Sequence, residues 1–252
     1  MVKSAERVIQ ILEHIGTETA GTTHGELTIA LEIPKSSLSA LLSNLVYREY
    51  LSFDKQSKHY HIGPQVLTLA GKYLAGLDTI KTAQPFVKEL MTITEESTEF
   101  AVKKGTDIQI LCKEDCLLPL QRVIQLGELS PIYITAAGKA ILAFLSEEEI
   151  NEYLSSAKMT SHTEKTITDP EKLRKQLNEV RRDGLAYSFE ERIEGISAIA
   201  APVFDMHGSV VGSLVVPTPT FRFTPEKKEK VEKALRDISK RLSHQLGYQT
   251  KD

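Results

Sequence analysis

Apolar residues recur at helical spacing in three short runs near the start of the chain. Between residues 4 and 15 they recur every three or four positions and predict an amphipathic helix. The residues that set this spacing are Ala5, Val8, Leu12 and Ile15. Residues 23–26, Thr-His-Gly-Glu, form a capping-box pattern in which two side chains bond the exposed amides of a helix start. A second, shorter helix is therefore predicted, ending before the Ile-Pro pair at 33–34.

The third helix has an unusual polar face. Proline fits the first helical position, where an N–H has no partner in any case, so Pro34 predicts its start. Larger apolar residues predict the buried side: Leu38, Leu41, Leu42, Leu45 and Val46. Small side chains remain for the outer side: Ser36, Ser37, Ser39, Ala40, Ser43 and Asn44. Such a face allows close approach to the DNA major groove, although serine is also common on a solvated helix.

Residues 50–63 alternate between apolar and polar side chains as a β-hairpin does. Leu51 and Phe53 precede a polar tip, Asp-Lys-Gln-Ser-Lys, and Tyr60 and Ile62 follow it. Two short helices with a tight connection, followed by a hairpin, are typical of a winged helix-turn-helix. We therefore predict this domain over residues 1–64 and a linker helix over residues 65–80.

The remainder, residues 81–252, mixes helical and alternating patterns. Helices are predicted to begin at Gln84, Ala136, Ser146, Asp169 and Pro225. Strands are predicted over residues 100–114 (a hairpin around Lys-Gly-Thr-Asp), 120–127, 130–135, 185–191, 196–205 and 209–218. We therefore predict an α+β domain built on an antiparallel sheet.

Composition fits a soluble globular protein. The chain has 252 residues, of which 41% are hydrophobic and 26% are charged, and its formal net charge is −3. Apolar runs fall short of the roughly 20 residues that a membrane span requires, and the N-terminus lacks the apolar core of a signal peptide. We expect a soluble, cytoplasmic protein with no membrane partner.

Metal binding is not indicated. The two cysteines, Cys112 and Cys116, form a single C-x3-C pair, which is poor spacing for a metal site, and the acidic residues beside them raise the thiol pKa. His59 and His61 share a face of the predicted hairpin without a third ligand nearby. We expect two incidental, reduced thiols and no metal.

Motifs of common enzyme classes are absent from the sequence, including the glycine-rich nucleotide loops and the G-x-S-x-G elbow. Glu190 and Glu191 are the strongest candidates for acid–base chemistry. An ion-paired or strand-end role fits these adjacent carboxylates better. We therefore predict no catalytic residue and no cofactor.

Residues 184–205, GLAYSFEERIEGISAIAAPVFD, resemble the signature of the IclR-type bacterial transcriptional regulators. The matching positions are Gly184, Ser188, Glu191, Ala198, Ile199, Ala200, Val203, Phe204 and Asp205. Residues 31–51 resemble the recognition segment of that family and residues 136–145 its pocket-loop helix. The resemblance implies a winged helix-turn-helix, a linker helix used in dimerisation, and a C-terminal GAF-like effector-binding domain. It also implies homodimers, often paired as dimers of dimers on operator DNA.

The recognition segment departs from the family pattern. Ala40 stands where members often carry arginine, and Glu32 where they often have glycine in the turn. Residues 1–64 contain six Lys or Arg and seven Asp or Glu, so their net charge of −1 gives DNA binding little support. We expect the serine face to read bases and the lysines to bind phosphates. The predicted DNA-binding residues are Lys35, Ser36, Ser37, Ser39, Ser43, Asn44, Lys55 and Lys58.

The effector pocket departs further. In members that sense glyoxylate or pyruvate, an Asp, a Cys and two Ser line the site, and this chain has Ser188, Ala198, Val215 and Pro217 at those positions. Three of these four polar groups have become apolar, and the negative charge is lost. The amides around Thr135, Ala136 and Ala137 remain for an anion at a helix start. We expect a larger, more apolar carboxylate, or else a pocket that is packed shut.

The resemblance predicts a ligand-responsive repressor of a catabolic operon, whose partners are operator DNA, a small-molecule effector and further copies of the chain. Effector binding would shift the packing of the C-terminal domains, and the linker helix would change the spacing of the recognition helices. The alternative is a small-molecule sensor or enzyme whose N-terminal domain serves only for dimerisation.

Overall fold

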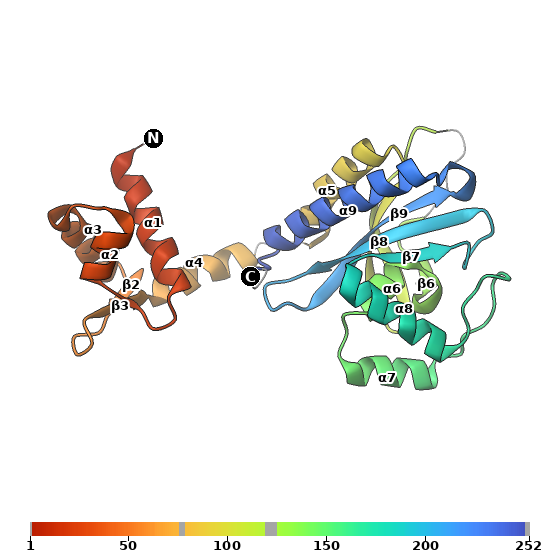
Figure 1. The fold of residues 1–252 in the computed structure, drawn as a ribbon, viewed down its shortest axis with the longest axis horizontal. Helices are drawn as coiled ribbons and strands as arrows, with labels where there is room; N and C mark the ends of the chain where they lie inside the picture. The colour runs from red at the N-terminus through yellow and green to blue at the C-terminus, as the bar shows by residue number, and fades with distance from the viewer. Residues whose placement is uncertain (1, 76–78, 119–124, 250–252) are drawn as a thin grey trace. The chain divides into compact units, whose positions relative to one another are not determined.

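The computed structural model describes residues 2–75, 79–118 and 125–249 (Figure 1). The chain divides into two compact units, residues 1–77 and residues 78–252, and each is described by itself. The predicted fold class is confirmed, because a helical unit with a small hairpin precedes an α+β unit with an antiparallel sheet.

Within its described residues, the N-terminal unit contains three helices and a small sheet, which are followed by α4 (Pro64–Ala75). The helices are α1 (Lys3–Thr17), α2 (His24–Leu31) and α3 (Lys35–Tyr47). The antiparallel sheet has the order β1 (Thr22–Thr23), β3 (His59–Ile62), β2 (Leu51–Phe53). Thr23 and Glu26 form the predicted capping box. Strand β1 was not predicted, since two residues are too short for a period to be visible.

Apolar side chains from the three helices meet in one core. Leu41 and Val46, predicted to be buried, are half-buried, and the other positions of the α3 stripe are buried. The core residues are Ile11, Ile15, Leu27, Ile33, Leu38, Leu42, Leu45 and Leu51. Because this stripe faces inward, the small polar residues of α3 are left on the outside.

Glu32 ends α2 in a left-handed conformation, with φ of 52° and ψ of 31°. A side chain in this region crowds the next carbonyl and costs roughly 1–2 kcal/mol, which glycine avoids. We expect Glu32→Gly to stabilise the connection between α2 and α3 by about 1 kcal/mol, because the flexibility of glycine in the unfolded chain offsets part of the gain. Slower hydrogen exchange of the α2 and α3 amides in the full-length protein would measure this effect.

Glu18→Gly is the matched control for this prediction. Glu18 follows α1 in an extended conformation with φ of −97°, so glycine relieves no strain there. The two substitutions remove the same side chain, and equal exchange rates in the two variants would contradict the expectation.

The predicted linker, residues 65–80, includes parts of two helices. Helix α4 covers Pro64–Ala75, and α5 covers Thr79–Thr94, so Thr79 and Ile80 belong to α5 rather than to the linker. Residues 76–78 of the predicted linker lie outside the described residues. Helix α5 also begins before the predicted start at Gln84, because Pro85 lies inside the helix instead of marking its first turn.

In the described part of the C-terminal unit, six antiparallel strands form one sheet, in the order β6-β5-β4-β9-β8-β7. They are β4 (Thr98–Lys104), β5 (Asp107–Glu114), β6 (Leu129–Pro131), β7 (Ala186–Phe189), β8 (Ile196–Phe204) and β9 (Val210–Pro219). Helices α5 and α9 (Pro225–Gln245) pack together on one face, and α6 (Ala136–Leu142) packs on the other (Figure 1). The pocket described below lies beside α6.

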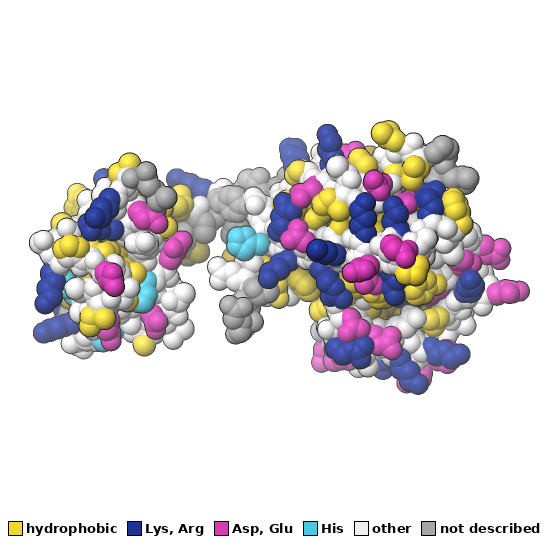
Figure 2. Space-filling model, turned by 45° about the horizontal axis from the view of Figure 1, so that its top comes forward, with side chains coloured by type: hydrophobic (Ala, Val, Ile, Leu, Met, Phe, Trp, Pro, Cys, Tyr) yellow, Lys and Arg dark blue, Asp and Glu magenta, His cyan; other side chains and the backbone are white. Residues whose placement is uncertain are grey.

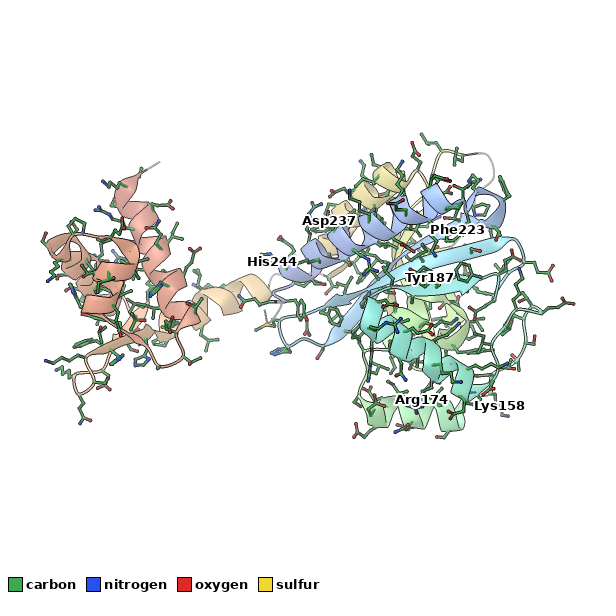
Figure 3. The ribbon with its side chains drawn as sticks, viewed as in Figure 1. Lys158, Arg174, Tyr187, Phe223, Asp237 and His244 are labelled. Carbon is green, nitrogen blue, oxygen red and sulfur yellow. The ribbon has the colours of Figure 1, made fainter. Side chains whose placement is uncertain are left out.

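Helix α8 (Pro170–Asp183) packs against α6, and α7 (Glu147–Ser156) lies below α8 in the view of Figure 1. Their starts agree with the prediction, since Ser146 forms a capping box and Asp169 caps α8, which Gly184 ends in a left-handed conformation. Arg174 extends from α8 toward α7 (Figure 3) and donates to Glu147 at 3.4 Å. This ion pair joins the two helices at the surface.

Two of the predicted strands differ in the structure. Residues 120–124 of the predicted strand 120–127 lie outside the described residues, and Gly127 stands in a turn with φ of 82°. The predicted strand 130–135 is short: β6 ends at Pro131, and Ile132–Ile134 form a 3-10 helix. All three residues of that helix are buried. Their apolar run therefore reflects complete burial and not a strand.

Candidate functional site

One side of α3 presents small polar side chains to solvent. Ser36, Ser39, Ser43 and Asn44 are exposed, and Ser37 is half-buried. Lys35 is exposed in the first turn of the helix. The structure thus places the predicted helix residues on one accessible surface, which we call the serine face.

Ser39 is held by two partners. Its hydroxyl donates to the carbonyl of Lys35 at 2.9 Å, and Nε2 of His24 lies 2.9 Å from the same oxygen. Since the hydroxyl proton is directed to Lys35, Nε2 is the donor toward Ser39. His24 begins α2, and the sequence pattern gave no sign that it reaches α3.

The tip of the β2–β3 hairpin presents the predicted lysines, Lys55 and Lys58, which are both exposed. Asp54 fixes this tip by accepting from the Ser57 hydroxyl at 2.7 Å and from the Gln56 amide at 2.8 Å. These hydrogen bonds hold the pKa of Asp54 below its usual value. The lysines therefore extend from a fixed turn.

Basic surface is not concentrated elsewhere on the face shown in Figure 2. Over the C-terminal unit, Lys and Arg side chains lie beside Asp and Glu side chains on that face. This agrees with the small net charge of −3. An electrostatic attraction for DNA would have to come from a local group of charges.

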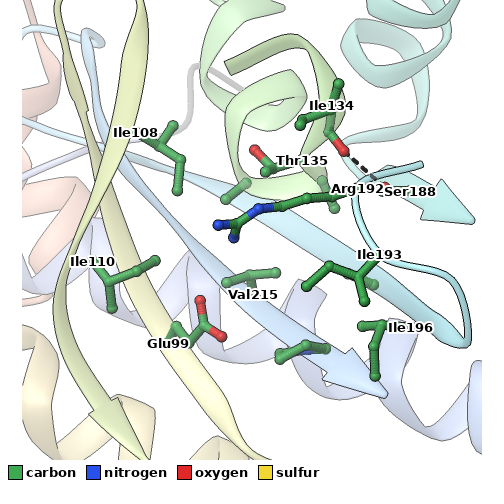
Figure 4. Close-up of a pocket in the computed structure, with 14 residues that line it drawn as sticks. Glu99, Ile108, Ile110, Ile134, Thr135, Ser188, Arg192, Ile193, Ile196 and Val215 are labelled. Carbon is green, nitrogen blue, oxygen red and sulfur yellow. Dashed lines mark hydrogen bonds between the residues drawn. The ribbon is translucent and has the colours of Figure 1, made fainter. Parts of the chain in front are cut away.

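All the predicted effector-binding residues line one cavity of the C-terminal unit (Figure 4). Its lining includes Thr135, Ala136, Ala137, Ser188, Ala198, Val215 and Pro217. Strand register explains how they meet. Ser188 on β7 pairs with Ala198 on β8, Ala198 pairs with Pro217 on β9, and Val215 lies on the same face two residues earlier.

The predicted polar groups are partly engaged inside the protein. The Ser188 hydroxyl donates to the Ile134 carbonyl at 3.0 Å, and Thr135 Oγ1 accepts from the Gly138 amide at 2.9 Å. Helix α6 covers only Ala136–Leu142. The short helix start is therefore a weaker anion site than the sequence predicted, and other groups must be considered.

Two charged residues missed by the sequence prediction also line the cavity. Arg192, from the loop after β7, extends into its middle, and Glu99 lies on β4, paired with Val215 of β9 (Figure 4). The four aligned positions carry no negative charge, as the sequence shows, but Glu99 and Arg192 add charged groups to the same lining. Isoleucines supply most of the remaining wall: Ile108, Ile110, Ile134, Ile193 and Ile196.

The cavity is small as it stands, with a volume of about 30 Å³. A cavity of this size holds about one or two water molecules. An organic ligand therefore requires side chains of the lining to move. Both the apolar lining and Arg192 border the remaining space.

A buried ion pair joins two walls of the cavity. Lys139 on α6 is fully buried, and its Nζ donates to both carboxylate oxygens of Glu191 at 2.5 and 2.7 Å. It also donates to the Tyr187 carbonyl at 3.3 Å. Burial lowers the pKa of Lys139 and raises the pKa of Glu191. The pair fixes α6 against the loop that carries Arg192.

Glu190 and Glu191 have different partners. Glu190 pairs with Lys165 at 2.9 Å, and this hydrogen bond lowers its pKa, whereas Glu191 pairs with Lys139. The two carboxylates do not form an acid–base couple, and the ion-paired interpretation is confirmed.

The cysteines are free thiols in the structure, and both are buried. Burial raises the pKa of Cys112 to about 11, so this thiol is far from reactive at neutral pH. Within residues 2–75, 79–118 and 125–249, no cluster of His, Cys, Asp and Glu has the composition of a metal site. Helices in the same part of the chain are all too short or too polar to cross a membrane.

Comparisons with known proteins bear on both units. Residues 4–55 match the IclR helix-turn-helix domain, and residues 71–244 match the family described as bacterial transcriptional regulator IclR C-terminal. The HTH-type transcriptional regulator KdgR of Escherichia coli K12 is 30% identical over 98% of this chain and 94% of its own length. The HTH-type transcriptional repressor AllR of the same strain is 27% identical over 97% of this chain and 90% of its own.

Solved structures agree. The crystal structure of Pseudomonas aeruginosa HmgR superposes with a TM-score of 0.85 at 25% identity, covering 99% of this chain and 100% of that one. The relatives are named as transcriptional regulators, not as enzymes. The enzyme alternative therefore loses its support.

Proposed function

The chain belongs to the IclR family of bacterial transcriptional regulators, and we propose that it represses a catabolic operon until a small organic acid binds its C-terminal unit. The protein is a DNA-binding regulator, as its relatives are. Repression is supported by the naming of AllR as a repressor. The operator contacts, the effector and its control of DNA binding are our proposal. Because the proposed partner is operator DNA, we also propose that the protein acts in the cytoplasm.

The serine face is the observation that carries the DNA part of the proposal. Within the IclR helix-turn-helix match, α3 exposes hydroxyl and amide groups where a recognition helix meets the major groove. Lys35, Lys55 and Lys58 would neutralise phosphates. With few cations per copy, tight binding requires more than one copy on the operator.

Exposed leucines on α4 support a homodimer. Leu67 is 76% exposed and Leu69 is 57% exposed in the single copy. Because Leu67 and Leu69 stand two positions apart, they face different sides of α4. A second copy covering one of these sides would pair two recognition helices on half-sites about one DNA turn apart. Dimers of dimers would add a further pair of contacts.

A fluorescence anisotropy titration of the full-length protein on the DNA upstream of its own gene tests the proposal. A regulator should bind this DNA specifically, and its affinity should fall steeply between low and moderate salt because phosphate contacts release counterions. A protein whose N-terminal unit served only for dimerisation would show no such binding, and that outcome would reject the proposal.

We expect the hairpin lysines to contribute to affinity without contributing to sequence preference. Lys55→Ala and Lys58→Ala should each lower the slope of log affinity against log salt by about 1, equally on operator and unrelated DNA. The measurement is the anisotropy titration repeated at four salt concentrations. Lys165→Ala, which removes an exposed lysine from the C-terminal unit, is the matched control and should leave the slope unchanged.

A further inference from the structure

An arginine of the candidate effector pocket is already paired with a carboxylate. The Arg192 side chain crosses the cavity among apolar residues (Figure 4), and its Nη2 donates to Glu128 Oε1 at 2.7 Å. The two side chains are only 21% and 27% exposed. A guanidinium in such surroundings needs an anion beside it, because an unpaired buried charge is costly.

Glu128 is the fixed member of this pair. Its Oε2 accepts from the Gln125 amide at 3.2 Å, and its carbonyl accepts from the Ile110 amide of β5 at 3.2 Å. Gly127 donates to Ile110 at 2.8 Å, which fastens the same turn to the sheet a second time. Arg192, by contrast, is a long side chain on a loop and can change rotamer. A change of partner therefore requires movement of the arginine alone.

We propose that Arg192 binds the anionic group of the effector, and that Glu128 is the internal anion that the effector displaces. The inference rests on the proposed function, because it names the ligand class of the same pocket. The cavity of about 30 Å³ has no room for an organic acid while Arg192 crosses it, so binding and displacement are one event. A neutral ligand would leave the guanidinium without a partner, and it is therefore excluded.

Glu99 narrows the ligand class further. Its side chain lines the cavity from β4 and is 4% exposed. A carboxyl group in the wall can exchange a hydrogen bond with a hydroxyl group, so it favours a ligand with a hydroxyl group in addition to its carboxylate. The pocket thus fits a small hydroxycarboxylate, with its carbon chain against the isoleucines.

Opposite effects of two substitutions test the exchange. The ligands tested are glycerate, propionate and benzoate, and glycerol is the uncharged counterpart of glycerate. The affinity for each ligand is taken from the concentration dependence of the melting temperature of the full-length protein. We expect glycerate to bind most tightly.

Arg192→Gln should weaken the binding of glycerate about 10- to 100-fold, since a charge-assisted hydrogen bond is lost. Glu128→Gln should strengthen the binding of glycerate about 3- to 10-fold, because the substitution removes the carboxylate that competes for Arg192.

Lys165→Gln, which breaks the neighbouring ion pair with Glu190, is the control and should leave affinity unchanged. If Arg192→Gln and Glu128→Gln weaken the binding of glycerate alike, the ion pair only stabilises the fold of the pocket, and the proposal is wrong. Equal binding by wild type and Arg192→Gln, or no binding of any acid to wild type and Glu128→Gln, would also overturn it. Failure of the proposed function would instead appear as absent DNA binding by the ligand-free wild type, which these ligand titrations do not measure.

Discussion

Replacement of Lys139 by methionine is expected to lower the free energy of unfolding of the C-terminal unit by about 3–5 kcal/mol, because it leaves one member of a buried ion pair without the other. The Glu191 carboxylate, 4% exposed, would lose two hydrogen bonds from Nζ and gain no water in exchange. Calorimetry of the full-length protein measures the change. The double variant Lys139→Met, Glu191→Leu should lose less of the free energy of unfolding than Lys139→Met alone, since both charges are then removed.

The loss should depend on pH. Burial already raises the pKa of Glu191, and removal of Lys139 takes away the charge that opposes this shift. The folded variant would then hold a proton that the unfolded chain releases above a pH of roughly 4.3. Because the folded state binds more protons, its stability falls as pH rises from that value toward the raised pKa. Lys139→Met should therefore be less destabilised at pH 5 than at pH 8.

Lys165→Met provides the matched control for both effects. Lys165 pairs with Glu190, the residue next to Glu191, but its side chain is 59% exposed. Water can replace this exposed partner, so the melting temperature should change little at either pH. Equal destabilisation by the two lysine substitutions would mean that the buried pair contributes no more than a surface pair.

The helical unit could be predicted closely because its signals are local. A capping box at Thr23 and Glu26, a proline at 34 and an apolar stripe each depend on residues within a few positions of one another. The hydrogen bond between His24 and Ser39 joins residues 15 positions apart and depends on how α2 packs on α3. No period or motif records such a contact, so it was missed.

The pocket was also predicted incompletely, because its lining joins residues that are still farther apart in the chain. Its predicted residues were found through resemblance to a family, and the structure brings them together through strand register. Glu99 joins them because β4 pairs with β9, although Val215 lies far along the chain. Arg192 joins them through a loop that α6 holds by the Lys139–Glu191 pair. Contacts between residues far apart in the chain bring in both side chains, and they add two charged groups to a lining that the sequence predicted to be mostly apolar.

Ser39→Glu is expected to weaken operator binding on the order of 100-fold. The substitution places a carboxylate on the serine face, where it would repel the DNA phosphates. The control is Thr19→Glu, which makes the same change of charge at an exposed turn between α1 and β1. Anisotropy titrations on the upstream DNA at one salt concentration compare the two variants. If both lose affinity equally, the effect is one of net charge, and the serine face does not read the operator.

Ser39→Ala separates charge from contact at the same position. It adds no charge, but it removes the hydroxyl that His24 Nε2 approaches at 2.9 Å and that donates to the Lys35 carbonyl. A loss of only a few-fold would mean that the hydroxyl itself contributes one ordinary hydrogen bond to the interface. A loss as large as that of Ser39→Glu would mean that the position of His24 matters more than the serine, and α2 would then take part in operator recognition together with α3.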